Sequence, residues 1–136
     1  MSLAVPEKAL YTLLEADSAF GALVGDRLYD GARPEADSLP AAVHDVISDT
    51  EKGPRTARAT SGTRPYWARI QLSCFGTTAE SAKAVAEAAI TACRGQSGSI
   101  GGVTVEDITF ERGPSIFDAD VAIHTQSVDF MVTYLR

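Results

Sequence analysis

Cysteine, histidine and long apolar runs are scarce in this chain of 136 residues. Of the two cysteines, we expect Cys74 in a strand and Cys93 in a helix, both as small buried apolar side chains in a reducing compartment. No run of about 18 apolar residues occurs, which argues against a membrane-spanning helix. The N-terminal MSLAVPEKAL has no cationic start followed by an apolar core, so no secretory signal is expected.

Motifs for catalysis, metals and cofactors are missing as well. His44 and His124 have no second histidine or cysteine at a ligand spacing, and we interpret both as exposed residues on the polar faces of strands. The acidic pairs within 106–107 and 118–120 lack a calcium-loop pattern and are interpreted as solvated turn residues. No phosphate-binding loop and no Gly-x-Ser-x-Gly elbow occurs. The sequence therefore predicts no catalytic residues, no metal site, no cofactor and no enzymatic activity.

Acidic residues outnumber basic ones by 18 to 12, which gives a net charge of −6 and a pI near 4.8. Such a chain lacks the broad cationic face of a protein whose main task is to hold nucleic acid. Four of the 12 basic residues nevertheless lie within residues 50–64, which have one acid, Glu51. This stretch carries +3 and the rest of the chain −9. Its basic residues are Lys52, Arg55, Arg58 and Arg64.

The stretch 50–64, which we call the arm, is predicted to be a long loop between two strands. Its glycines and proline disfavour a helix, and two alanines are its only apolar side chains, so it cannot contribute to a core. Loops of this length in compact domains are usually functional or disordered. Three interpretations are open: a solvated hairpin loop, a nucleic-acid arm with strongly salt-dependent affinity, or an arm that becomes ordered against an acidic partner surface.

Apolar periodicity predicts the elements before the arm. A helix opens at Pro6, and Asp17-Ser18 ends it and starts a short second turn. A short extended piece follows at 27–29, then a loop at 31–40 and a strand at 41–48.

The strongest patterns follow the arm. Residues 66–75 alternate between apolar and polar side chains and predict a strand with one buried face. A capping box of Thr77 and Glu80 then starts a helix that stops at Gly95. Its apolar stripe contains mostly small residues, which predicts close packing on a flat sheet. The stripe consists of Ala82, Val85, Ala86, Ala89, Ile90 and Cys93.

The C-terminal part of the chain predicts two further strands. Residues 96–102 read as a flexible connection, and 103–112 as a strand with a bulge between Val105 and Ile108. Gly113-Pro114 should turn the chain, and 121–135 form the last strand. We predict a single α+β domain over 1–136, with an antiparallel-dominated sheet of about four strands and two helices on one face.

Four further residues are candidates for a protein interface. Trp67 and Arg69 should point outward from the strand at 66–75; Trp67 is either an interface anchor or tucked under the arm. Ile116 and Phe117 should lie on the turn after Gly113-Pro114, either in an interface or folded back over the core.

The order and spacing of five segments resemble the tail-completion proteins of long-tailed bacteriophages, also called tail terminators or tail-to-head joining proteins. The segments are EKALYTLLEAD, FGALVGDRLYDGARP, SLPAAV, YWARIQLSCFGTTAESAKAVAEAAITAC and VDFMVTYLR. Each consists of packing and turn residues, and together they span nearly the whole chain. The arm is longer than in many relatives, so the resemblance assigns it no role.

The resemblance implies a structural protein of the virion tail, present in the host cytoplasm during assembly. It implies a ring, typically a homohexamer, that sits on the last ring of the tail tube protein and stops its polymerisation. The other face of the ring would meet the head-side connector or stopper protein, and DNA would pass through the lumen without specific binding. The resemblance leaves open whether the particle is a phage, a gene transfer agent or a domesticated prophage.

Two alternatives remain open at this stage. Another neck protein, such as a head-side stopper, would have a similar size, although stoppers are usually richer in strands. A small cytoplasmic α+β ligand-binding domain or enzyme would have a pocket lined by the histidines and would be a monomer or dimer at every concentration.

Overall fold

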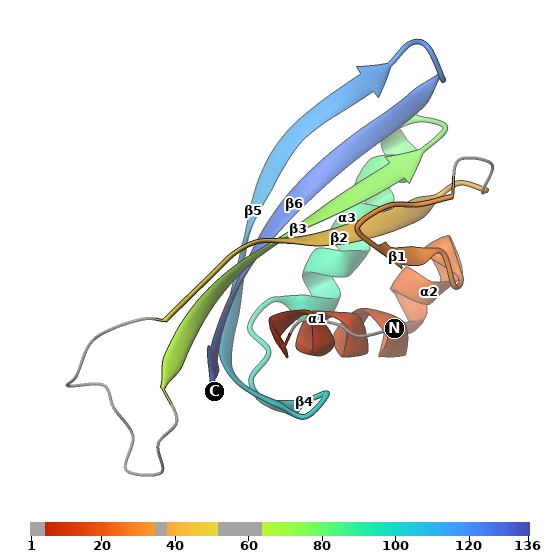
Figure 1. The fold of residues 1–136 in the computed structure, drawn as a ribbon. Helices are drawn as coiled ribbons and strands as arrows, with labels where there is room; N and C mark the ends of the chain where they lie inside the picture. Colours follow the sequence, from red (N-terminus) through yellow and green to blue (C-terminus); the bar gives the residue numbers. More distant parts are fainter. Residues whose placement is uncertain (1–4, 35–37, 52–63) are drawn as a thin grey trace.

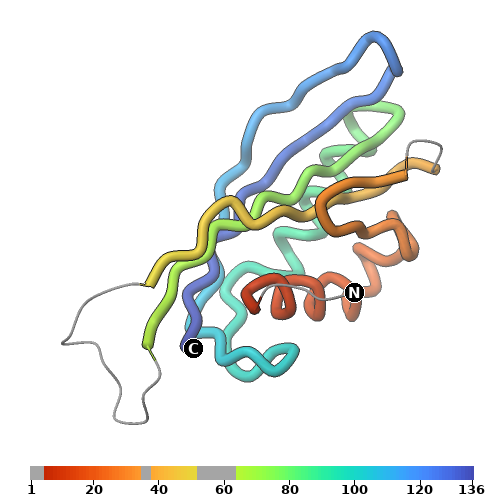
Figure 2. The backbone as a smooth tube through the Cα atoms, in the orientation of Figure 1, coloured from red at the N-terminus to blue at the C-terminus, as the bar shows by residue number. Residues whose placement is uncertain are grey.

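The computed structural model describes residues 5–34, 38–51 and 64–136 (Figures 1 and 2). In these residues three helices lie on one face of a curled sheet of six strands, and the opposite face of the sheet is uncovered (Figure 1). The α+β class and the helices on one face agree with the prediction, but the expected four strands and two helices were too few. Three candidate residues of the arm, Lys52, Arg55 and Arg58, lie outside the described residues.

Helices α1 (Val5–Ala16) and α2 (Ser18–Val24) form the N-terminal part of the helical layer. Pro6 stands in the first turn of α1, where its missing N–H costs no hydrogen bond. The Asp17 carboxylate accepts a hydrogen bond from the backbone N–H of Phe20 at 2.8 Å and so caps α2. Because of this cap, the predicted short turn is a helix of its own, and the described residues have three helices in place of the predicted two.

Helix α3 (Ala79–Cys93) begins one residue later than predicted. The capping box consists of Thr78 and Ser81, not Thr77 and Glu80: the Thr78 hydroxyl accepts from the Ser81 N–H at 3.0 Å. Two adjacent threonines suit the cap position equally well, and only the path of the preceding strand selects between them. All six residues of the predicted apolar stripe are buried.

The sheet has the strand order β1-β2-β3-β6-β5-β4, with β1 parallel to β2 and every other pair antiparallel. The two strands beyond the predicted four are three-residue edge strands, too short for an alternating pattern. One of them, β1, corresponds to the short extended piece expected at 27–29. The other, β4, lies in the predicted flexible connection. The strands are β1 (Leu28–Asp30), β2 (Ala41–Glu51), β3 (Pro65–Gly76), β4 (Gly98–Ile100), β5 (Val103–Asp118) and β6 (Ile123–Leu135).

Strand β5 departs most from the prediction. The expected bulge is present as a register shift between Val105 and Asp107. The Gly113-Pro114 pair, however, does not turn the chain; a second register shift between Arg112 and Ser115 accommodates it, and β5 continues to Asp118. Beyond β4, strand β5 pairs with β6 alone, so Pro114 lies on an edge where no N–H is needed.

The core lies between the helices and the inward face of β3 and β6 (Figure 1). Cys74 and Cys93 are both fully buried in it, as predicted. No helix of the described ranges is long and apolar enough to cross a membrane. The inward side chains of the two central strands are those that the alternation predicts: Ala68, Ile70, Leu72 and Cys74 in β3, and Val128, Phe130, Val132 and Tyr134 in β6.

Candidate functional site

The uncovered face of the sheet presents the first group of candidate residues. Trp67 stands on this open face beside Thr133 of β6, and 47% of its surface is exposed. Together with Thr109 and Met131 these residues line a shallow depression of about 330 Å³. The outward orientation of Trp67 agrees with the prediction, and its exposure shows that it is not covered by the described part of the chain.

Arg69 lies two residues after Trp67 on β3, and its side chain points to the same open face. Its Nε donates to the Asp129 Oδ2 on β6 at 3.0 Å, and its Nη2 also contacts that oxygen. This hydrogen bond raises the pKa of Arg69. The Arg69 side chain is still 46% exposed, whereas the Asp129 side chain is 12% exposed. Arg69 is therefore a positioned cation, held at a defined place on the open face.

Arg64 stands where the arm enters β3. Its Nη1 lies 3.3 Å from the Glu51 Oε2, at the point where β2 leaves the sheet. Its backbone exchanges two hydrogen bonds with Arg136, the C-terminal residue. Because the single acid of the arm is paired with Arg64, the charge of +3 on the arm is carried by residues 52–63 alone.

Ile116 and Phe117 lie on the final residues of β5, not on a turn. They are 57% and 53% exposed, and neighbouring strand residues point to opposite faces, so each face of this hairpin end presents an apolar side chain. The Phe117 ring packs against His124 of β6 at 4.5 Å between centroids. Their exposure rules out the alternative of a tip folded back over the core. With Val121, 57% exposed, they form what we call the hairpin tip.

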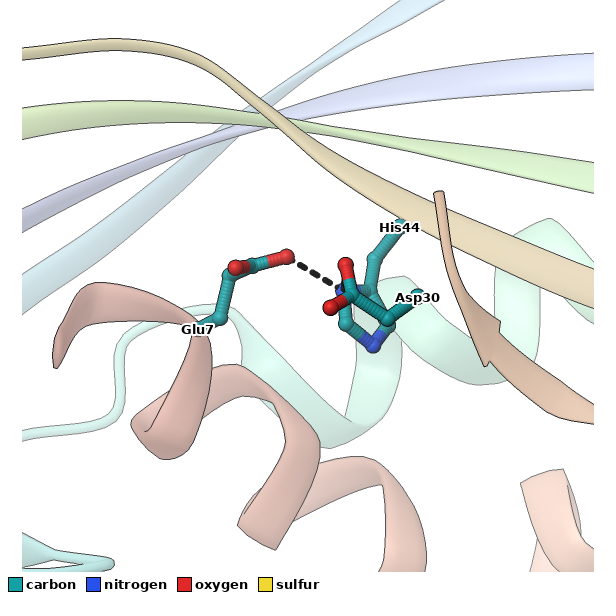
Figure 3. Close-up of side chains that lie close together, drawn as sticks. All are labelled: Glu7, Asp30 and His44. Carbon is teal, nitrogen blue, oxygen red and sulfur yellow. Dashed lines mark hydrogen bonds and ion pairs between the residues drawn. The ribbon is translucent and has the colours of Figure 1, made fainter. Parts of the chain in front are cut away.

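A buried polar cluster joins α1 to the edge of the sheet (Figure 3). His44 on β2 is 2% exposed, so the prediction of an exposed strand histidine was wrong for this residue. Its Nδ1 lies 2.6 Å from the Glu7 Oε2 and 3.8 Å from the Asp30 Oδ1. Glu7 is 5% exposed, and Tyr11 packs its ring edge-on against His44.

Sequence reasoning missed this cluster because its members are 14 to 37 positions apart and share no motif. One sequence signal does indicate that His44 is buried. Side chains two positions apart in a strand point to the same face, so His44 shares the inward face of β2 with Ala42 and Val46. The other histidine, His124, is half-buried beside Phe117.

The acid pairs agree with the prediction in part. Asp118 and Asp120 lie at the turn after β5, where the Asp118 carboxylate accepts from the Asp120 N–H. Glu106 and Asp107 are exposed as expected but lie within β5, not on a turn.

The described surfaces include exposed apolar side chains in two places, Trp67 on the open face and the hairpin tip. Exposed large apolar side chains on a sheet face and a hairpin end are typical of interfaces. A family model described as Tail completion protein gp17 matches residues 8–135, and the chain belongs to this family.

The fold is similar to that of a chain in a solved virion structure. A chain of the structure titled "Virion of native gene transfer agent (GTA) particle" is 22% identical, with a TM-score of 0.73; the match covers 99% of this chain and 100% of that chain. A search of curated protein sequences gave no match.

The family resemblance drawn from the five sequence segments is thereby confirmed. The chain is a structural protein of a bacteriophage-type virion, located in the tail and involved in tail completion. Its family is one of structural tail proteins rather than enzymes, and its members interact with other tail and head components.

Proposed function

We propose that the chain assembles into a ring, a homohexamer, that caps the tail tube, stops its polymerisation and joins the tail to the head-side connector. The observation that carries this proposal is the family match over residues 8–135. The likeness to a chain of a gene transfer agent virion, over nearly the full length of both chains, supports the same setting.

Two different exposed surfaces support self-assembly into a ring. The open face offers Trp67 and the positioned Arg69, whereas the hairpin tip offers Ile116 and Phe117. Contacts between unlike surfaces of identical subunits are heterologous, and they form a closed ring when the rotation between neighbours closes. We propose that these four residues contribute to the contacts between neighbouring subunits or with the tail tube.

Termination requires no chemical step in this proposal. The ring matches the end of the tube on one face and does not offer the tube surface again on the other, so no further tube ring can add. The acidic body, −9 outside the arm, would line a lumen that repels DNA and lets the genome pass. The cations of the arm would pair with an acidic surface of a neighbouring subunit or of the tube protein.

Deletion of the gene in a producing strain tests the function directly. We expect tails of abnormal length that carry no heads, and restoration of normal particles when the wild-type gene is supplied on a plasmid. Electron microscopy of the lysate measures both properties. Normal headed particles from the deletion strain would refute the proposal, and headless tails of normal length would favour a head-side stopper instead.

A further inference from the structure

The cluster of Glu7, Asp30 and His44 has a composition and a geometry that the ring proposal does not use. Two carboxylates face one imidazole, and each residue comes from a different element: α1, β1 and β2 respectively (Figure 3). We propose that these three residues form a binding site for one divalent transition-metal ion of the Zn²⁺ type.

The distances between the ligand atoms fit such an ion. Two ligand atoms of a tetrahedral zinc site, each about 2.0–2.1 Å from the metal, are about 3.3 Å apart. The His44 Nδ1 lies 2.6 Å from one carboxylate oxygen and 3.8 Å from the other, so the two observed distances bracket the required one. All three ligand atoms lie within 4.8 Å of one another. The third separation, between the Glu7 and Asp30 oxygens, is therefore no more than 4.8 Å, and side-chain adjustment without a change of fold would build three of the four tetrahedral positions.

The negative charge of the two carboxylates favours the binding of a cation by the cluster. Glu7 and His44 are almost completely buried, and a buried carboxylate is costly unless its charge is compensated. Even a protonated imidazole leaves two carboxylates with one uncompensated negative charge, whereas a divalent ion neutralises both. On binding, the proton shared by the His44 Nδ1 and Glu7 leaves to solvent, and the nitrogen lone pair replaces it on the metal.

The ligand types select the metal, and the burial pattern provides access. Imidazole nitrogen suits zinc and its neighbours, whereas Mg²⁺ and Ca²⁺ prefer oxygen ligands alone. The Asp30 side chain is 32% exposed, so an ion and a water molecule for the fourth position can enter from its side. The ligand nitrogen of His44 would be Nδ1, because it is the ring nitrogen that faces both carboxylates. The other ring nitrogen, Nε2, is buried and has no hydrogen-bond partner among the described residues. Such an ion would hold α1 against the β1–β2 edge.

Calorimetric titration of the purified chain with ZnCl₂ tests the site, without reference to ring formation. We expect saturable binding of one ion that a large excess of MgCl₂ does not displace. Asp30→Asn keeps the shape of a partly exposed side chain and should weaken binding at least about tenfold, with an unchanged circular dichroism spectrum. Asp45→Asn, an exposed acid next to His44 in sequence, is the matched control and should bind zinc like the wild type.

A second measurement identifies the nitrogen that binds the metal. Long-range ¹H–¹⁵N spectra should show that zinc shifts the Nδ1 of His44 and leaves both ring nitrogens of His124 unchanged. Three results would overturn the proposal: no saturable binding, equal binding by the wild type and Asp30→Asn, or loss of binding in His124→Gln. Any of them would leave the cluster as a buried hydrogen-bonded group that anchors α1.

Discussion

Trp67 is the single tryptophan of the chain, and nearly half of its surface is exposed on the open face of the sheet. Thr109, Met131 and Thr133 line the depression beside it, and the positioned guanidinium of Arg69 lies two residues away on the same strand. A large aromatic side chain in such a setting is the kind of residue that contributes most to the free energy of association.

The emission of Trp67 should therefore report on assembly. We expect a blue shift of the fluorescence maximum when subunits assemble or bind tail tubes, because the indole leaves water. Trp67→Ala should keep the stability of the isolated subunit and weaken assembly by about 2 kcal/mol or more, roughly thirtyfold. Thr109→Ala, at the rim of the same depression, is the control. An emission maximum that stays constant through assembly would exclude Trp67 from the interface.

The two buried cysteines should make the free energy of unfolding depend on pH. Burial raises the pKa of Cys74 and of Cys93 to about 12, from an ordinary value near 9. The folded chain thus keeps both thiols protonated at pH values where the unfolded chain loses the protons. The stabilisation is complete below about pH 9, and the free energy of unfolding should decrease as the pH rises from about 9 toward 12.

Thiol labelling gives a direct check of this prediction. At pH 8, a disulfide reagent such as dithionitrobenzoate should label neither cysteine in the native protein and both in guanidinium chloride, because only the thiolate reacts. Replacing both cysteines by alanine should remove the extra pH dependence. Rapid labelling of the native protein at pH 8 would show that one of the thiols is accessible and ionised.

At the scale of elements, the β5–β6 hairpin is the feature that local patterns describe least well. Strand β5 runs through the Gly113-Pro114 pair and reaches Asp118, so Ile116 and Phe117 stand on a paired strand end and not on a loose turn. Pairing with Thr125 and His124 gives both side chains fixed positions. A pre-ordered apolar tip loses little conformational entropy on binding, which suits a contact surface.

The double variant Ile116→Ser, Phe117→Ser tests the hairpin tip. Both side chains are more than half exposed, so the free energy of unfolding in urea should change by no more than about 1 kcal/mol. Assembly, measured by light scattering with purified tail tubes, should be clearly weakened. Ile47→Ser removes another half-exposed apolar side chain, on β2, and is the matched control. Equal assembly of the two variants and the wild type would remove the tip from the proposed interface.

Charge is distributed unevenly over the whole molecule. Glu51 and Arg64 pair at the base of the arm, so the surplus of +3 belongs to residues 52–63, attached to a body of −9. The described strand ends place this base at the end of the sheet opposite the hairpin tip (Figure 1). A subunit with opposite charges in separate places can attract a second copy in one preferred orientation.

Removing cations from the arm should weaken assembly without affecting the fold. For Arg55→Ser, Arg58→Ser we expect an unchanged melting temperature and reduced assembly near 0.15 M salt, with a difference from wild type that shrinks at 1 M because salt screens the attraction. Lys8→Ser, Lys83→Ser removes the same charge from exposed helix positions and serves as the control. Assembly that is the same for both variants at 0.15 M would show that the arm is only a solvated loop.

The sequence by itself determined the features that depend on neighbours within a few positions. The small-residue stripe of α3, the alternation of β3 and β6 and the composition of the arm are local patterns, and the order of the segments sufficed to recognise the family. Only the tertiary structure decided which distant residues meet, since that depends on strand register and helix placement. It joined His44 to Glu7 and Arg69 to Asp129, and it carried β5 through a Gly-Pro pair because that edge needs no N–H donor.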